Sequence, residues 1–193
     1  MNVSEKKIER VCPVELAGGL DTCFRRLYEN PGKILGPYIN KGMTVLDMGC
    51  GPGYFSVEMA RMVSAKGRVI AADLQEGMLD IVKQKIAGTG LEERIILHKC
   101  ETDKTGIAEK VDFILMFYVV HEIPDAGTFF GEMSSLLKPE GRILVVEPPF
   151  HVSKKSFENT ISIARNKGLV SIKRPRMIFR KAVLLGKDEA RVS

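Results

Sequence analysis

The sequence lacks a long apolar run and lacks the spacing of a metal site. Its longest uninterrupted apolar stretch, residues 113–120, is too short to cross a membrane and is typical of a buried parallel strand. None of the four cysteines forms a CxxC pair and the three histidines are scattered, so no metal site is expected. No apolar stretch follows the charged N-terminus, which argues against a signal peptide and predicts a cytoplasmic protein.

Repeats and low-complexity segments are also absent, and the composition is that of one globular domain. The 193 residues are 45% hydrophobic and 27% charged, which argues against disorder. The charge is uneven, because residues 151–193 carry a net charge of +8 and the rest of the chain carries −3. This basic region could bind nucleic acid or an anionic substrate. Alternatively, it is a solvated sheet edge whose cations prevent edge pairing.

Strand and helix patterns alternate along most of the chain. We expect a helical cap over residues 1–40, with a short helix from Pro31 to Ile39, and a main domain over residues 41–193 that forms one structural unit with it. Strands separated by helices predict an α/β, doubly wound parallel sheet that binds ligands at the carboxyl ends of its strands. The expected strands are 44–48, 68–73, 95–98, 111–118 and 142–147, the expected helices are 54–63, 75–87, 126–137 and 154–167, and an antiparallel pair over 170–173 and 179–185 closes the sheet.

A glycine-rich loop follows the first expected strand. Residues 47–53 read DMGCGPG, so an acidic residue leads three alternate glycines into a helix. Glycines let such a loop turn tightly and approach a ligand closely, and the N–H groups at the helix start favour an acceptor group. A dinucleotide fingerprint has glycine or alanine at the sixth position counted from Gly49, where this chain has Tyr54. A pyrophosphate cradle is therefore disfavoured.

Acidic residues follow the second and third expected strands. Asp73 ends the second strand, where a carboxylate can accept hydrogen bonds from both hydroxyls of a ribose. Its alternative role is to cap the helix that begins near Gln75. Glu101 follows the third strand and could face the edge of an adenine, although the neighbouring Cys100 competes for that position.

Together these pieces resemble the class I S-adenosylmethionine-dependent methyltransferases. The resemblance covers residues 40–186 and is strongest to the group that includes the ubiquinone and menaquinone biosynthesis methyltransferases. It is carried by residues 45–53 (VLDMGCGPG), 71–74 (AADL), 78–79 (ML), 111–113 (VDF), 120–125 (VHEIPD) and 137–142 (LKPEGR). Many relatives have Gly-Asp-Ala after the third strand, where this chain has residues 99–103 (KCETD). The resemblance therefore leaves open, by one position, which residue contacts the adenine.

The resemblance implies a fold, a cofactor and a set of binding residues. The fold is a Rossmann-like seven-stranded sheet in the order 3-2-1-4-5-7-6 with strand 7 antiparallel, and the cofactor is S-adenosylmethionine. Asp73 would bind the ribose, and the backbone of Phe117 would contact the methionine amino group. The loop residues that would hold the methionine part are Asp47, Gly49, Cys50, Gly51 and Gly53, and those that would surround the adenine are Leu74, Met78, Glu101 and Thr102.

Methyl transfer from a sulfonium needs neither a metal nor a covalent intermediate, so positioning dominates and a base is needed only if the acceptor must lose a proton. His121 follows the fourth strand and is the catalytic candidate, because an imidazole titrates near neutral pH. Glu122, Glu147 and His151 lie at neighbouring strand ends and are further candidates. The alternative for each is a purely structural role.

We expect a small-molecule acceptor, in a pocket that a second subunit of a homodimer could complete and that Arg25, Arg26 and Tyr28 of the cap could gate. RNA or protein is the alternative acceptor, and the residues that motivate it are Lys173, Arg174, Arg176, Arg180 and Lys181. A nicotinamide-dependent oxidoreductase and a non-catalytic cofactor-binding protein are alternatives of another class.

Overall fold

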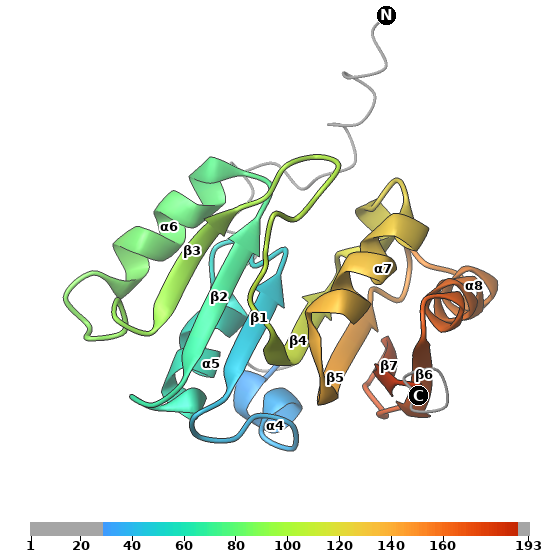
Figure 1. Ribbon diagram of the computed structural model, residues 1–193, viewed down its shortest axis with the longest axis horizontal. Helices are drawn as coiled ribbons and strands as arrows, with labels where there is room; N and C mark the ends of the chain where they lie inside the picture. The colour runs from blue at the N-terminus through green and yellow to red at the C-terminus, as the bar shows by residue number, and fades with distance from the viewer. Residues whose placement is uncertain (1–28, 189–193) are drawn as a thin grey trace, which may run out of the picture.

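Seven strands form one mixed sheet in the order β3-β2-β1-β4-β5-β7-β6 (Figure 1). The structure is a computed structural model that describes residues 29–188. Most of the expected cap, including Arg25, Arg26 and Tyr28, lies outside the described residues. Within them, β7 runs antiparallel to β5 and β6, and the other neighbouring strands are parallel. The strand order predicted from the resemblance is confirmed.

The elements follow the expected alternation closely. The strands are β1 Thr44–Met48, β2 Arg68–Asp73, β3 Ile95–Lys99, β4 Val111–Phe117, β5 Leu137–Glu147, β6 Leu169–Lys173 and β7 Lys181–Lys187. The helices are α4 Pro31–Leu35, α5 Tyr54–Val63, α6 Glu76–Ile86, the 3-10 turn η2 Val120–Glu122, α7 Ala126–Leu136 and α8 Lys154–Asn166.

Most boundaries lie within one residue of the prediction, and the larger differences concern α4, β7 and β5. Helix α4 ends at Leu35, so the short helix does not reach Ile39. Strand β7 begins at Lys181, because Met177 and Arg180 form a tight turn before it. Strand β5 begins at Leu137, before residues 138–141, which were expected as a turn.

The turn at residues 138–141 is present as a bulge within β5. Leu137 pairs with Val111 and Arg142 pairs with Phe113, so β5 advances by five residues where β4 advances by two. The Lys138 ammonium donates to Asp112 at 2.8 Å, and Asp112 also accepts the Thr44 N–H at 2.9 Å. These contacts hold the bulge at the amino end of the sheet, far from the carboxyl ends that carry the loops.

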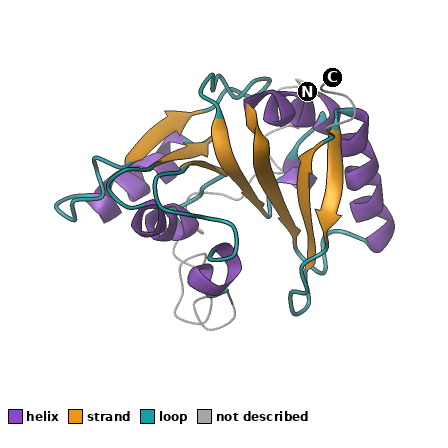
Figure 2. Ribbon diagram, turned by 60° about the horizontal axis from the view of Figure 1, so that its bottom comes forward, coloured by secondary structure: helices purple, strands orange, loops and turns teal. Residues whose placement is uncertain are grey.

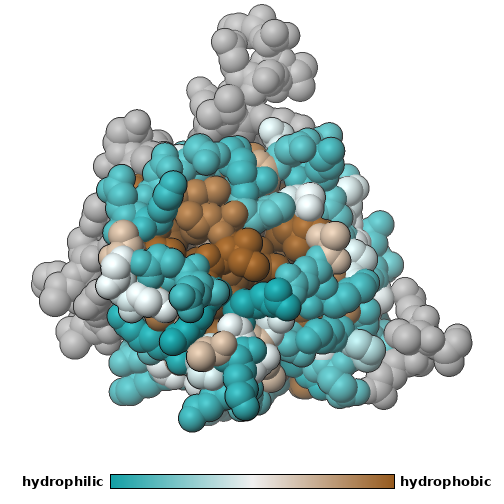
Figure 3. All heavy atoms as spheres, turned by 60° about the vertical axis from the view of Figure 1, so that its left-hand side comes forward, coloured by the Kyte–Doolittle hydropathy of each residue, from teal (hydrophilic) through white to brown (hydrophobic). Residues whose placement is uncertain are grey.

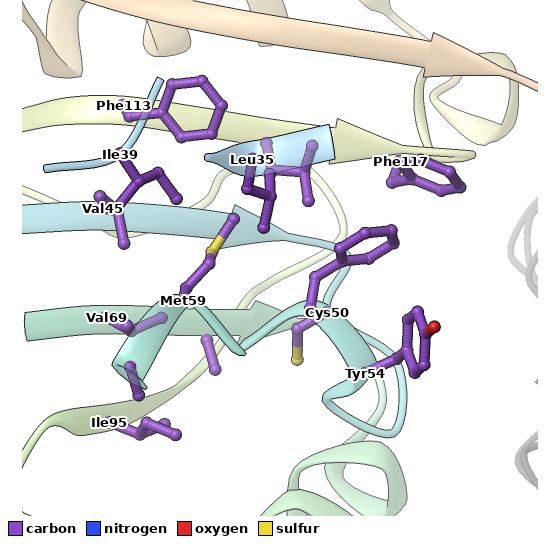
Figure 4. Close-up of a cluster of buried hydrophobic side chains, with 14 of the residues drawn as sticks. Leu35, Ile39, Val45, Cys50, Tyr54, Met59, Val69, Ile95, Phe113 and Phe117 are labelled. Carbon is purple, nitrogen blue, oxygen red and sulfur yellow. The ribbon is translucent and has the colours of Figure 1, made fainter. Parts of the chain in front are cut away.

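Helices cover both faces of the sheet (Figure 2). Side chains alternate along each strand, so β4 directs Phe113 to one face and Ile114 to the other. Helices α4, α5 and α6 pack on the first face, and α7 and α8 pack on the second. Figure 4 shows the first cluster, in which Val45, Val69 and Ile95 come from three neighbouring strands. Burial on both faces explains the apolar strands of the sequence.

The surface outside this core is mostly hydrophilic, with apolar residues gathered at the centre of the face in Figure 3. In the described part of the chain, five large apolar side chains are exposed by more than 40%: Ile96, Phe150, Ile172, Ile178 and Phe179. Among residues 29–188, no helix combines the length and apolar character that a membrane span requires.

Candidate functional site

A cavity of about 770 Å³ opens at the carboxyl ends of β1, β2, β4 and β5. Chain connections diverge there, because β1 connects to β2 on one side, whereas the chain crosses from β3 to β4 on the other side of β1. Open α/β sheets bind their ligands at this kind of switch point. All of the predicted cofactor-binding residues line the cavity except Gly53, and the catalytic candidate His121 lines it as well.

The glycine loop approaches the cavity at Gly51. This residue has a φ of 52°, in the left-handed region, and a Cβ built on it would meet no atom within 4 Å. The loop therefore leaves open space where a ligand can come close to the backbone. Gly49 and Cys50 anchor the loop, because both N–H groups donate to the carbonyl of Ala72 in β2, at 2.8 and 3.0 Å.

Gly53 serves the packing of the loop. Its φ is 77°, and a Cβ there would lie 2.8 Å from Cγ2 of Val82 in α6. Glycine is thus required for close contact between the loop and α6. Gly53 is also the N-cap of α5. Gly53 does not line the cavity, whereas its loop neighbours do, and its part in cofactor binding stays a prediction.

Asp73 faces the cavity and does not cap α6, because the N-cap of that helix is Gln75. Its carboxylate is buried and accepts the N–H of Gly51 at 2.9 Å and that of Gln75 at 2.8 Å. Burial raises the pKa of this carboxyl, and the N–H groups oppose that rise. A carboxylate has about four acceptor sites, so a ligand hydroxyl can be bound beside these contacts. The predicted cap role is wrong, since these bonds hold the glycine loop and the turn before α6, and the ribose role stays a prediction.

Asp47 and Cys50 are buried beneath the loop. Asp47 accepts a hydrogen bond from the hydroxyl of Ser56 at 2.5 Å, which ties the end of β1 to the first turns of α5. Burial raises the pKa of the Cys50 thiol, which is therefore protonated at neutral pH. Burial also raises the pKa of Cys100, to about 11. Neither thiol is a nucleophile at neutral pH.

The segment after β3 forms the rim of the cavity. Cys100 is buried, and Glu101 and Thr102 are exposed. The Glu101 carboxylate lies 3.3 Å from the ammonium of Lys104, and the Glu101 N–H donates to the Lys104 carbonyl at 3.1 Å. The structure thus turns Cys100 inward and leaves Glu101 at the cavity edge.

His121 and Glu147 form a close pair on the opposite side of the cavity. His121 lies in η2, and its Nδ1 is 2.6 Å from one carboxylate oxygen of Glu147 at the end of β5. The His121 N–H donates to the other oxygen at 3.1 Å. A carboxylate only accepts, so Nδ1 carries the proton and Nε2 holds the lone pair of the neutral ring.

The surroundings of His121 favour its charged form. The hydrogen bond with Glu147 raises the pKa of the imidazole, and burial opposes this effect. Glu122 lies nearby, with Oε1 at 4.0 Å from Nε2 of His121. Burial raises the pKa of Glu122 to about 7. Two groups with raised pKa values thus line one cavity, which is typical of catalytic sites.

Tyr118 was missed by the sequence reasoning. It lines the cavity beyond β4 with a φ of 64°, and its hydroxyl donates to Oε1 of Glu29 at 3.0 Å. Arg180 donates to the Tyr118 hydroxyl and also pairs with Glu29 at 2.8 Å. Burial raises the pKa of Tyr118 to about 12. No local signal in the sequence links residues 29, 118 and 180, because only the folded chain brings them together.

The basic C-terminal region is partly used by internal contacts. Arg180 belongs to the partly buried cluster with Glu29 and Tyr118. Arg174 makes two hydrogen bonds to Glu158, at 2.5 and 2.7 Å. Two of the five cations that motivated an RNA or protein acceptor are therefore paired within the chain.

Comparison with known proteins shows which protein family this chain is similar to. The model of the family described as methyltransferase domain matches residues 39–182. The demethylmenaquinone methyltransferase of Oceanobacillus iheyensis is 28% identical over 109 residues, 56% of this chain and 46% of that protein. The ubiquinone/menaquinone biosynthesis C-methyltransferase of Haemophilus ducreyi is 29% identical over 110 residues, 56% of this chain and 42% of that protein. The chain spans about half the length of these relatives.

A solved structure extends the similarity over nearly the whole chain. A protein of Aquifex aeolicus, described as a SAM dependent methyltransferase, superposes with a TM-score of 0.82 at 26% sequence identity. The match covers 90% of this chain and 98% of that one.

Proposed function

The chain belongs to the methyltransferase domain family, and we propose that it transfers a methyl group from S-adenosylmethionine to a small uncharged molecule. The family and the Aquifex neighbour bear out the cofactor that the sequence predicted. The observation that carries the proposal is one cavity with two ends. The glycine loop and Asp73 line one end, and His121, which contacts the buried Glu147, lines the other.

The residues of the first end fit the cofactor. The open space at Gly51 suits close approach of the methionine part, and the free acceptor capacity of Asp73 suits the ribose hydroxyls. Leu74 and Met78 offer apolar contact to the adenine, with Glu101 and Thr102 at the rim. The bound cofactor supplies an activated methyl group on a sulfonium.

Two further residues suit the methionine amino group. Asp47 places a buried carboxylate at the end of β1, and Phe117 ends β4 beside it, because Asp47 pairs with Leu115 in the ladder. A carboxylate and a backbone carbonyl both accept from an ammonium. We assign this part of the cofactor to the cavity at the carboxyl ends of β1 and β4.

His121 is assigned as the base and Glu147 as its positioning residue. In the neutral ring, Nε2 can take a proton from an acceptor hydroxyl as the methyl group is transferred. The Glu147 carboxylate fixes the ring orientation and stabilises the imidazolium that forms. The proton thus moves to Nε2 of His121, and no metal is required for the step.

The charge of the lining favours an uncharged acceptor. Seven carboxylates line the cavity, and its one lysine, Lys104, is paired with Glu101. Such a lining repels a nucleic acid backbone and other polyanions. The relatives above are named for methylating quinone precursors. An aromatic acceptor with a phenolic hydroxyl fits both observations, because His121 can remove the hydroxyl proton.

Transfer of labelled methyl groups tests this proposal. The protein is incubated with methyl-labelled S-adenosylmethionine and with soluble quinols, RNA and protein fractions in parallel. We expect label in the quinol fraction, and we expect His121→Gln to lower kcat by roughly 10²- to 10⁴-fold, the range for loss of a general base. Label in RNA or protein alone would refute the small-molecule acceptor.

The pH dependence of kcat distinguishes a catalytic role of His121 from a purely structural one. In Glu147→Gln the pKa of His121 should fall, because the charged partner is lost, so the acidic limb of kcat should move to lower pH. Glu140→Gln is the matched control, since Glu140 is exposed and distant from the cavity. A profile that does not move in Glu147→Gln contradicts the assignment of His121 as the base.

A further inference from the structure

Three large apolar side chains stand out from one end of the molecule. Phe150 is 92% exposed, Ile178 is 73% exposed and Phe179 is 82% exposed. They lie on two loops that leave the same end of the β5–β7 ladder, where Glu147 pairs with Lys181. The Lys181 ammonium also donates to the Pro149 carbonyl at 3.3 Å, which ties the loops together. We call these three side chains the apolar tips.

The turn that carries Ile178 and Phe179 presents them outward. Met177 and Arg180 form a β-bridge, and the Arg180 N–H donates to the Met177 carbonyl at 3.2 Å. Ile178 and Phe179 occupy the two central positions of this turn. Phe179 has a φ of 59°, in the left-handed region that a bulky residue rarely adopts. A glycine would fit this turn without strain, so packing within the chain does not account for an exposed phenylalanine here.

The apolar tips lie beside the mouth of the cavity. Pro148 and His151 line the cavity on either side of the loop that carries Phe150. The turn at Ile178 and Phe179 is followed at once by Arg180, which contacts the cavity residue Tyr118. A surface that covers the apolar tips would therefore face the cavity entrance.

Cations flank the apolar tips. Lys155, Lys173 and Arg176 are exposed, and within residues 29–188 none of them forms an ion pair. Arg174 is the exception, because Glu158 neutralises it. Exposed aromatic and aliphatic side chains with lysine and arginine beside them are the pattern of a surface that enters the interface of an anionic bilayer.

We propose that this edge docks on an anionic lipid bilayer, with the apolar tips in the interface and the flanking cations at the headgroups. An RNA surface would use the cations and the two aromatic rings but would leave Ile178 without a contact. A protein surface would not need the positive charge. The proposal stands on exposure and charge, so it does not depend on the methyl acceptor. It places the cavity mouth at the membrane surface, where a lipophilic acceptor resides.

Sedimentation with vesicles tests the proposal. The full chain is mixed with vesicles of phosphatidylcholine alone or with added phosphatidylglycerol. We expect binding to the anionic vesicles that weakens with salt, and a loss of roughly tenfold or more in partitioning for Phe179→Ser, since one buried apolar side chain is removed. Ile96→Ser is the matched control, because Ile96 is exposed on β3 at the opposite edge of the sheet.

Charge reversal tests the second half of the proposal. Lys173→Glu should weaken binding to anionic vesicles by roughly fivefold or more, given about 1 kcal/mol for each cation near the surface. Lys66→Glu is the control, since Lys66 is exposed in the turn before β2. All variants should keep their S-adenosylhomocysteine affinity and circular dichroism spectrum, which separates docking from folding and from the proposed reaction.

Four results would overturn the proposal. The first is no sedimentation with either kind of vesicle, and the second is an equal loss of binding in the Ile96→Ser control. The third is RNA binding that Lys173→Glu abolishes while vesicle binding is absent. The fourth is a dimer, measured by light scattering, that Phe179→Ser converts to a monomer without any vesicle binding. The last result would assign the apolar tips to contact with a second copy of the chain.

Discussion

Replacing Asp73 by alanine should weaken cofactor binding and loosen the glycine loop at the same time. The ribose hydroxyls would lose a charged acceptor, and hydrogen bonds to charged groups contribute about 1.5–3 kcal/mol. This loss corresponds to a rise in Kd of roughly 10- to 150-fold. The variant also leaves the N–H groups of Gly51 and Gln75 without the carboxylate. An unsatisfied buried donor costs about 1–3 kcal/mol. Because cavity water can reach these two N–H groups, we expect each to cost close to the lower end of that range, a stability loss of about 2 kcal/mol in total.

Calorimetry with S-adenosylhomocysteine measures the affinity, and urea denaturation measures the free energy of unfolding. Ser153→Ala provides a control for the loss of a side-chain acceptor of backbone N–H alone, because Ser153 is the N-cap of α8 and accepts the Ser156 N–H at 3.0 Å outside the cavity. That control should lose about 1 kcal/mol of stability and no affinity. If Asp73→Ala loses stability but binds S-adenosylhomocysteine as tightly as the parent, Asp73 only holds the glycine loop in place and its assignment to the ribose is wrong.

Two further predictions concern the loop and a buried carboxyl. Gly51→Ala should mainly weaken S-adenosylhomocysteine binding, because the new methyl group enters open space in the cavity. Gly53→Ala should mainly lower stability, by roughly 2 kcal/mol or more, because the new methyl group meets Val82. Calorimetry and denaturation should rank the two variants in opposite order, and the same order in both would contradict this reading. Glu122→Gln should raise stability above pH 7 by on the order of 1–3 kcal/mol and leave it unchanged below pH 4.5, because burial raises the pKa of Glu122 from 4.5 to about 7. The control Glu93→Gln, at an exposed position, should show no such pH dependence, and an equal gain in both variants would argue against buried charge as the cause.

The fold could be predicted from the sequence because each element carries a local signal. The apolar run in β4 is buried on both faces of the sheet, and the glycine loop leads from β1 into α5 as its pattern indicates. The bulge in β5 could not be predicted, since residues 138–141 have the composition of a turn. Only pairing with β4 on both sides of these residues makes them part of a strand.

The site was predictable one strand end at a time, but its contacts were not. His121 and Glu147 were both named as candidates, yet their 2.6 Å contact arises because β4 and β5 run parallel and end together. Arg180 was assigned to a basic surface from its charge alone. Its contacts with Glu29 and Tyr118 depend on the antiparallel position of β7, which no short sequence pattern encodes.

Isothermal titration calorimetry of the unmodified chain with S-adenosylhomocysteine and with NAD tests the central claim most directly. The cavity geometry predicts saturable binding of S-adenosylhomocysteine at one site and no heat with NAD, because Tyr54 stands at the sixth position of the loop pattern, where a dinucleotide fingerprint has glycine or alanine. Tight binding of NAD with no S-adenosylhomocysteine signal would contradict the account.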